Sequence, residues 1–191
     1  MGDFMREEIS KIVEKYLSIY SDEKEKLERL TLFLQEQEDV FDWNNFNGHI
    51  TVGAFLYSKK EDEFLVLYHK DLKMYLYPGG HIDESDSTPL IAAMRELREE
   101  TGLDNIVIYS ICDNELVPID IDIHMIDYNE RLNLPAHYHF DFRYLFIIDE
   151  KVNIKVDKTE IKDYRWISFD EFKKYQEFGD IIDKICDVKE K

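Results

Sequence analysis

The chain has 191 residues, of which 44% are hydrophobic and 14% aromatic, so it can bury a core and most of it is not intrinsically disordered. Its 24 basic and 42 acidic side chains give a formal net charge of −18. A surface this acidic repels phosphate backbones and anionic membranes, which excludes stable nucleic-acid or membrane binding. An anionic substrate would have to be attracted locally, through a bound cation and a few placed basic side chains.

We expect neither a membrane-spanning segment nor a secretory signal peptide. The first ten residues are charged and lack an apolar signal-peptide core, and no apolar run approaches the roughly 20 residues that cross a bilayer. Cys112 and Cys186 lie far apart without metal-ligand spacing, so reduced thiols are expected rather than a disulfide or a zinc site. We therefore expect a cytoplasmic protein.

Residues 4–38 have the apolar spacing of two helices, with a break at Ser21-Asp22 where either residue can cap the second helix. We predict a helical hairpin over residues 1–44 that covers the main domain, residues 45–191. A role of the hairpin in partner binding or in a homodimer stays open. The spacing rests on Ile9, Ile12, Val13, Tyr16, Leu17 and Tyr20 in the first helix and on Leu27, Leu30, Phe33 and Leu34 in the second.

The main domain alternates strand and helix patterns. A helix is predicted from Pro89, after a cap at Ser87 or Thr88, to a left-handed end at Gly102. Ser168-Phe-Asp-Glu171 is a capping box that begins a last helix. Together these patterns predict a mixed sheet with flanking helices, in the α/β (α+β) class. The predicted strands are His49–Tyr57, Phe64–His69, Met74–Tyr77 (stopped by Pro78-Gly79-Gly80), Asn105–Ser110, Pro118–Tyr128, Ala136–Ile148 and Tyr164–Ile167.

Three glutamates of one predicted helix are candidate metal ligands. Glu96, Glu99 and Glu100 stand at positions i, i+3 and i+4 of the predicted helix, which places three like charges on one face near its C-terminal end. A divalent cation would offset this cost, and oxygen ligands suit Mg²⁺. The turn at Gly79-Gly80 allows a backbone carbonyl to approach the same site. The alternative is a solvated acidic face with ion pairs to arginine.

The segment from Gly79 to Leu103 resembles the Nudix box, G-x5-E-x7-R-E-U-x-E-E-x-G-U, where U is bulky and apolar. The first half departs from it: the first Glu position holds Asp86, and a one-residue insertion follows before Arg95. The resemblance covers roughly residues 48–175, and it implies a Nudix-type α/β/α sandwich. The second half matches fully, at Arg95, Glu96, Leu97, Glu99, Glu100, Gly102 and Leu103.

The resemblance implies a Mg²⁺-dependent pyrophosphohydrolase, with Mn²⁺ as a substitute, that cleaves a diphosphate linkage in a nucleotide-like molecule. Glu99 and Glu100 would be the main metal ligands, and Glu96 a further ligand or the group that orients the attacking water. The Gly79 carbonyl would help to bind the metal, and Arg95 would hold a box glutamate. Glu160 is a candidate for the general base, with an ordinary surface acid as the alternative.

A second polar set follows the strand period of two. Asp120, Asp122 and His124 share one face of their strand, and His137, His139, Asp141 and Arg143 share one face of the next. The two strands are expected to pair as a long hairpin. One interpretation is a hydrogen-bonded sheet face without function. In the other, the second group lines the substrate cleft, with Arg143 as a phosphate clamp and a histidine as ligand of a second metal.

The sequence leaves two alternatives to the hydrolase. Isopentenyl-diphosphate isomerase shares the fold, but neither cysteine stands beside a histidine-rich metal motif in the sequence. A non-catalytic Nudix module that senses a nucleotide would be signalled by lost box glutamates, and all three are present here. The sequence does not discriminate among the substrates of the family.

Overall fold

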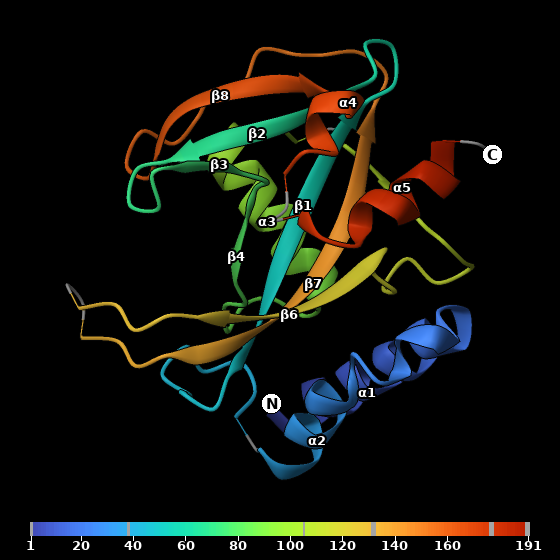
Figure 1. Ribbon diagram of the computed structural model, residues 1–191, viewed down its shortest axis with the longest axis vertical. Helices are drawn as coiled ribbons and strands as arrows, with labels where there is room; N and C mark the ends of the chain where they lie inside the picture. Colours follow the sequence, from blue (N-terminus) through green and yellow to red (C-terminus); the bar gives the residue numbers. More distant parts are fainter. Residues whose placement is uncertain (1, 38, 105, 131–132, 176–177, 190–191) are drawn as a thin grey trace.

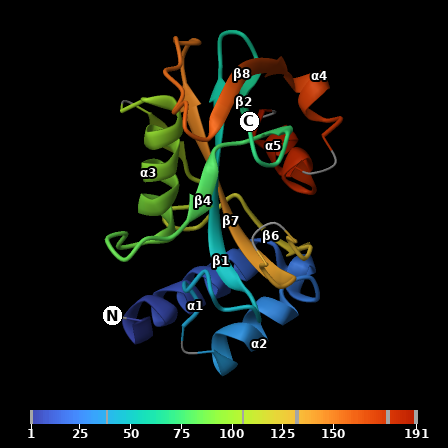
Figure 2. The same cartoon turned by 90° about the vertical axis from the view of Figure 1, so that its left-hand side faces the viewer.

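The computed structural model of the protein describes residues 2–37, 39–104, 106–130, 133–175 and 178–189. An eight-stranded mixed sheet forms its centre, with helices on both faces, which confirms the predicted α/β sandwich (Figures 1 and 2). The strands are β1 (His49–Ser58), β2 (Glu63–His69), β3 (Met74–Leu76), β4 (Gly79–His81), β5 (Val107–Tyr109), β6 (Asp120–Ile126), β7 (His137–Ile148) and β8 (Ile161–Ser168). The helices are α1 (Gly2–Ile19), the 3₁₀ helix η1 (Ser21–Lys24), α2 (Glu28–Glu36), α3 (Pro89–Thr101), α4 (Phe169–Phe172) and α5 (Ile181–Lys189).

The sheet is organised around the parallel pair of β1 and β7, which runs from His49 opposite His139 to Ser58 opposite Ile148. Each of these long strands changes its other partner along its length. β1 pairs antiparallel with β4 in its first half and with β2 at its end. β7 pairs with β6 in its first half and with β5 in its second. The first halves of β1 and β7 therefore lie between β4 and β6.

The two faces of the sheet pack against different helices (Figure 2). On one face α3 buries Leu90 and Leu97 in a core that also takes in α1 and α2. On the other face Phe172 of α4 and Ile181 of α5 pack in a second core with Phe55 of β1. The helix predicted to begin at Ser168 is the short helix α4, which ends at Phe172. The helix α5 follows it as a separate element.

The helix α3 has the ends that the sequence predicts. The Thr88 hydroxyl accepts a hydrogen bond from the Ile91 N–H at 3.2 Å, Pro89 occupies the first turn, and Gly102 is left-handed at φ 71°. A Cβ at Gly102 would be strained at that φ, so glycine suits this cap. These ends fix α3 on the sheet and so set the positions of the box glutamates.

Two local predictions were wrong. The second helix of the hairpin does not begin at a Ser21 or Asp22 cap, because both residues lie in η1 and α2 begins at Glu28 without a side-chain cap. Instead, η1 places Glu23 to accept a 2.6 Å hydrogen bond from the Tyr16 hydroxyl. The predicted turn at Gly79 is the start of the short strand β4, which pairs with β1.

A buried charge network joins the helical hairpin to the sheet and to α5. Asp120 of β6 is fully buried, and its Oδ1 lies 2.5 Å from the Lys184 ammonium of α5. The same ammonium lies 2.6 Å from Glu23 and donates to the Tyr16 hydroxyl at 2.5 Å. The hairpin is thus fixed by ion pairs as well as by apolar packing, and the division at residue 44 stays a prediction.

We predict that Lys184→Met lowers the free energy of unfolding by about 3 kcal/mol, because removal of one partner leaves buried carboxylates undercompensated. The measurement is urea denaturation at neutral pH. The matched control is Lys173→Met, whose partner Asp170 is exposed, with an expected change below about 1 kcal/mol. Equal effects of the two substitutions would contradict a structural role of the network.

Candidate active site

The box glutamates lie against the glycines of β4. The Gly79 N–H donates to Glu100 Oε2 at 3.1 Å. A Cβ at Gly80 would lie 2.5 Å from Glu96 Oε1, and a Cβ at Gly79 would lie 2.4 Å from the Val52 carbonyl. A side chain at Gly79 would clash with the backbone of β1, and one at Gly80 would displace the Glu96 carboxylate, so glycine at both positions preserves this arrangement.

Arg95 is the hub of the box. Its Nη1 donates to Glu96 at 2.8 Å and to Glu99 at 3.0 Å. Its Nη2 donates to the His81 carbonyl at 2.8 Å, which ties α3 to β4. The guanidinium therefore orients two of the three box glutamates.

Asp86 also binds Arg95, in spite of the one-residue insertion between the two in the sequence. Its side chain is 3% exposed, and its Oδ2 accepts from Arg95 Nη2 at 2.8 Å. The same oxygen accepts from the Asp83 N–H at 2.9 Å, which closes the loop before α3. The extra residue is absorbed in this loop, and Asp86 reaches the arginine of the box.

The box carries negative charge that the protein only partly compensates. Burial raises the pKa of Glu100 to about 8, against the hydrogen bond from Gly79. Burial also raises the pKa of Glu96, against the charge of Arg95. Glu99 is half exposed. A cation beside these oxygens would stabilise their ionised forms.

The donor set fits Mg²⁺ by its chemistry, since all candidate ligands are carboxylate or carbonyl oxygens. Among the described residues, the box glutamates do not bring three ligand atoms within 4.8 Å of one another. Arg95 Nη1 lies between Glu96 and Glu99. This spacing is compatible with Mg²⁺, which keeps several waters and commonly takes only one or two carboxylates from the protein.

A second polar surface lies on the first halves of four neighbouring strands. The predicted hairpin of β6 and β7 forms, and the register aligns polar residues in rows across β6, β7 and β1. His124, His139 and His49 form one row. Asp122, Asp141 and Thr51 form the next, with His81 of β4 opposite Thr51, and the third row is Asp120, Arg143 and Gly53, with Gly79 opposite Gly53.

Arg143 is paired with several carboxylates of this surface. Its side chain is 1% exposed, and it donates to Asp141 at 3.0 Å, to Asp122 at 2.9 Å and to the Phe178 carbonyl at 2.9 Å. Asp120 lies 3.3 Å from its Nη1. A phosphate at this guanidinium would meet these carboxylates, so the geometry favours a structural part for Arg143 over the phosphate clamp expected from the sequence.

Five histidines gather at the end of this surface. The His49 ring lies 4.9 Å from that of His137 and 4.7 Å from that of His139, with His81 and His124 beside them. Burial, and then the neighbouring rings, lower the pKa of His49 to about 4 and of His139 to about 2. These rings are therefore neutral at pH 7. The sequence pointed to His137 and His139 but not to His49 or His81, which stand on strands far away in the chain.

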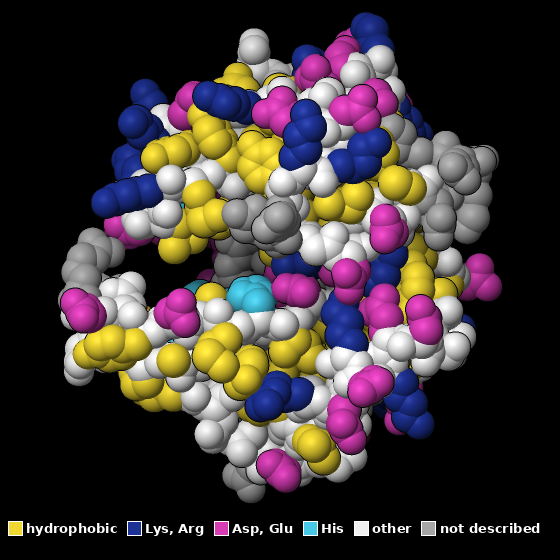
Figure 3. All heavy atoms as spheres, viewed as in Figure 1, with side chains coloured by type: hydrophobic (Ala, Val, Ile, Leu, Met, Phe, Trp, Pro, Cys, Tyr) yellow, Lys and Arg dark blue, Asp and Glu magenta, His cyan; other side chains and the backbone are white. Residues whose placement is uncertain are grey.

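A cavity of about 710 Å³ lies along the second polar surface, within the range of roughly 300–1,000 Å³ that is usual for small-molecule sites. Figure 3 shows the hollow in the molecule, with a histidine side chain at its edge. The cavity meets the box at the backbone of β4, whereas His137 and the side chains of the box are not among its lining residues. Those that line it include Gly79, Gly80, His81, His139, Asp141 and Arg143.

Glu160 lies outside this cavity, in the turn before β8. Its side chain is 65% exposed and lies 3.9 Å from His69. The Asp157 N–H, just before this turn, donates to the Glu100 carbonyl at 3.2 Å, so the turn lies beside the end of α3. Neither cysteine is among the described residues that line the cavity, so the isomerase alternative gains nothing from the fold.

We predict that Asp86→Asn lowers the free energy of unfolding by about 2 kcal/mol, because a buried charge-assisted pair with Arg95 is lost. Urea denaturation measures it. Asp83→Asn is the control, since its carboxylate is 63% exposed and 3.7 Å from Arg95, and we expect little change. A neutral effect of Asp86→Asn would mean that the insertion has removed this position from the box.

Comparison with known proteins agrees with this geometry. The sequence model described as NUDIX domain matches residues 48–185. A curated protein of Lactococcus lactis, named probable DHNTP pyrophosphohydrolase, is 30% identical over 141 residues, which are 71% of this chain and 76% of that protein.

Solved structures show the same fold. A NUDIX family hydrolase from Clostridium perfringens is 28% identical, with a TM-score of 0.52 over 65% of this chain and 84% of that one. An Ap4A hydrolase of C. elegans in a binary complex is 17% identical, with a TM-score of 0.55 over 73% of this chain and 96% of that one. The latter likeness concerns the fold alone. Together with the box, these matches establish that the chain belongs to the Nudix hydrolase family.

Proposed function

We propose that the protein is a Mg²⁺-dependent pyrophosphohydrolase that cleaves a phosphoanhydride bond in a small nucleotide-like molecule. The observation that carries this proposal is the close approach of Glu96 and Glu100 to the Gly79-Gly80 backbone, which also lines the cavity of about 710 Å³. Glu96, Glu99 and Glu100, with the Gly79 carbonyl, are the groups that would hold the metal.

Bound Mg²⁺ supplies neutralisation of the phosphate charge and a lowered pKa of a coordinated water. The described lining of the cavity supplies little of that positive charge. Arg143 is the only Lys or Arg among the described residues that line it, and carboxylates surround its guanidinium. A diphosphate therefore needs the metal for binding as well as for reaction.

The protein's own groups position the reaction. Arg95 holds Glu96 and Glu99, so their free oxygens can orient a water toward phosphorus. The oxygen of water forms a bond to phosphorus, the bond to the bridging oxygen breaks, and the two products each carry phosphate. Glu160 is the proposed acceptor of the water proton, because its charge acts on Glu100 from a turn beside the box.

The cavity favours a substrate with an apolar ring system. Leu72, Met74 and Leu76 form one wall, opposite the histidines and carboxylates of the sheet. Such a wall suits the face of a base or a similar heterocycle. The Lactococcus lactis relative is named for DHNTP, so DHNTP belongs in the first panel of substrates, beside nucleoside triphosphates, nucleotide sugars, ADP-ribose and Ap4A.

We predict that one class in this panel is hydrolysed with Mg²⁺ or Mn²⁺ and not with EDTA. Glu99→Gln should reduce kcat by roughly a hundredfold or more, since it weakens both metal binding and water orientation. Phosphate release and ³¹P NMR of the products measure it. The matched control is Glu84→Gln, an exposed acidic residue of the preceding loop, which should retain full activity.

Full activity of Glu99→Gln with an intact fold would exclude this glutamate as a metal ligand. No turnover of any member of the panel, together with tight binding of one of them, would replace the enzyme by a nucleotide-sensing module.

A further inference from the structure

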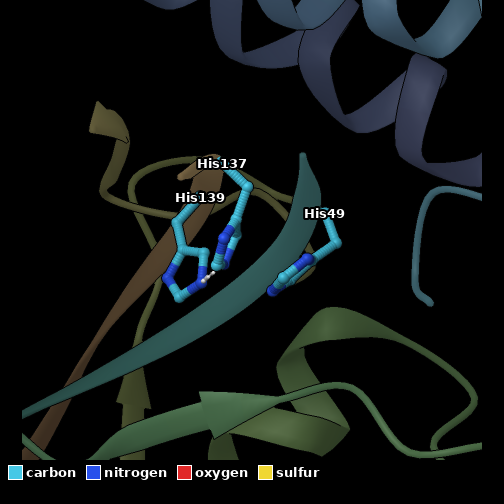
Figure 4. Close-up of side chains that lie close together, drawn as sticks. All are labelled: His49, His137 and His139. Carbon is cyan, nitrogen blue, oxygen red and sulfur yellow. Dashed lines mark hydrogen bonds between the residues drawn. The ribbon is translucent and has the colours of Figure 1, made fainter. Parts of the chain in front are cut away.

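Five of the six histidines of the chain converge from four strands onto one end of the sheet. Three of them, His49 of β1 and His137 and His139 of β7, direct ring nitrogens toward one another (Figure 4). One potential ligand atom from each lies within 4.8 Å of those of the other two. No other set of three or more His, Cys, Asp or Glu side chains in the described ranges reaches this spacing.

We propose that His49, His137 and His139 bind a transition-metal ion of the Zn²⁺ class, at a site separate from the carboxylates of the box. Imidazole nitrogen suits Zn²⁺, Co²⁺ or Ni²⁺, whereas Mg²⁺ prefers oxygen. The chain would then hold two kinds of metal on two different donor sets.

The spacing of the nitrogens fits such an ion. His137 Nε2 and His139 Nε2 lie 3.3 Å apart. Around a tetrahedral ion with metal–nitrogen bonds of roughly 2.0–2.1 Å, two ligand nitrogens are about 3.3–3.4 Å apart. The two rings are thus already at the separation that two ligands of one ion require.

The hydrogen bonds of His137 set its proton in the way that ligation needs. Its Nδ1 lies 2.7 Å from the Pro135 carbonyl, which can only accept, so Nδ1 carries the hydrogen. In the neutral ring, Nε2 then holds a lone pair directed at His139. Metal-binding histidines commonly donate their second nitrogen to a backbone carbonyl in this manner.

His49 is buried, so water cannot hydrogen-bond to the nitrogens of its ring. The residue is 1% exposed, and its Nε2 lies 3.2 Å from His81 Nε2. Its Nδ1 makes no hydrogen bond of regular geometry, although the Asn45 backbone lies near enough to raise the pKa of the ring. Hydrogen bonds alone therefore account poorly for the burial of this ring among other imidazoles. A metal bond to the group would offset the cost.

The site would act next to the substrate. His139 lines the cavity, as do His81 and His124, while His49 and His137 lie behind it. Three protein ligands leave a coordination position for water or for a ligand oxygen, as in catalytic rather than structural zinc sites. The ion would place positive charge beside the cavity, on a donor set distinct from that of the box.

The test is a Co²⁺ titration of the chelator-stripped full chain, in excess Mg²⁺ to occupy the box. We expect one Co²⁺ per chain, with the intense visible absorption of a four-coordinate imidazole site, and its displacement by Zn²⁺. His137→Gln and His139→Gln should each weaken Co²⁺ binding by roughly a hundredfold or more. His69→Gln, the one histidine outside the cluster, should leave binding unchanged and is the matched control.

The double variant Glu99→Gln/Glu100→Gln separates this proposal from the proposed hydrolase. It should lose hydrolysis but keep the Co²⁺ spectrum, because the two donor sets are distinct. Absence of the imidazole spectrum in the unmodified chain would overturn the site, whether or not the chain hydrolyses a diphosphate. Loss of the spectrum in the double variant, with retention in the histidine variants, would overturn it as well.

Should a histidine variant lose its circular-dichroism signature, the melting temperature of the unmodified chain decides the matter. Zn²⁺ in excess Mg²⁺ is expected to raise it, because an ion that binds only the folded chain stabilises it. An unchanged melting temperature would count against the site.

Discussion

The parallel pairing of β1 with β7 determines where the side chains of the second polar surface and the histidine cluster lie. Because side chains alternate along a strand, the register of His49 with His139 places alternate residues of both strands on one surface. β4 and β6 add their own rows at the two edges of this pair. A slip of one residue would exchange the polar surface with the core face that carries Phe140 and Phe142.

The second constraint is charge. The chain has a net charge of −18, and two of its arginines are committed to internal carboxylates at the two polar sets. Arg95 serves the box, and Arg143 serves the acidic rows of the sheet. An anionic substrate would thus need a bound cation. The oxygen ligands of the box and the nitrogen ligands of the histidine cluster are the two proposed sites for that cation. In the proposed hydrolase, this acidity is the reason why the reaction would depend on a metal ion.

The sequence predicted those features that local spacing encodes. The period of α3, its caps at Thr88 and Gly102, and the pairing of β6 with β7 all follow from neighbouring residues. The positions of Asp86 and His49 did not, for different reasons. A loop insertion hides the contact of Asp86 with Arg95, and His49 joins the other histidines only through a parallel pairing of strands far apart in the chain.

The sequence also did not predict which polar side chains are buried. Alternation placed Arg143 correctly on a polar face but could not tell a solvated face from a buried one, since Asp120 of β6 and the Phe178 carbonyl before α5 enclose it from other parts of the sequence. The same applies to Lys184, whose partner Asp120 lies in another element altogether.

The most direct test of the account is the binding of Mn²⁺ to the box, followed by electron paramagnetic resonance with the histidine cluster filled by Zn²⁺. The account predicts that Glu100→Gln weakens Mn²⁺ binding by roughly tenfold or more, while His139→Gln leaves it unchanged. Mn²⁺ affinity that is indifferent to Glu100→Gln in the folded protein would contradict the assignment of the box as the metal site of the hydrolase.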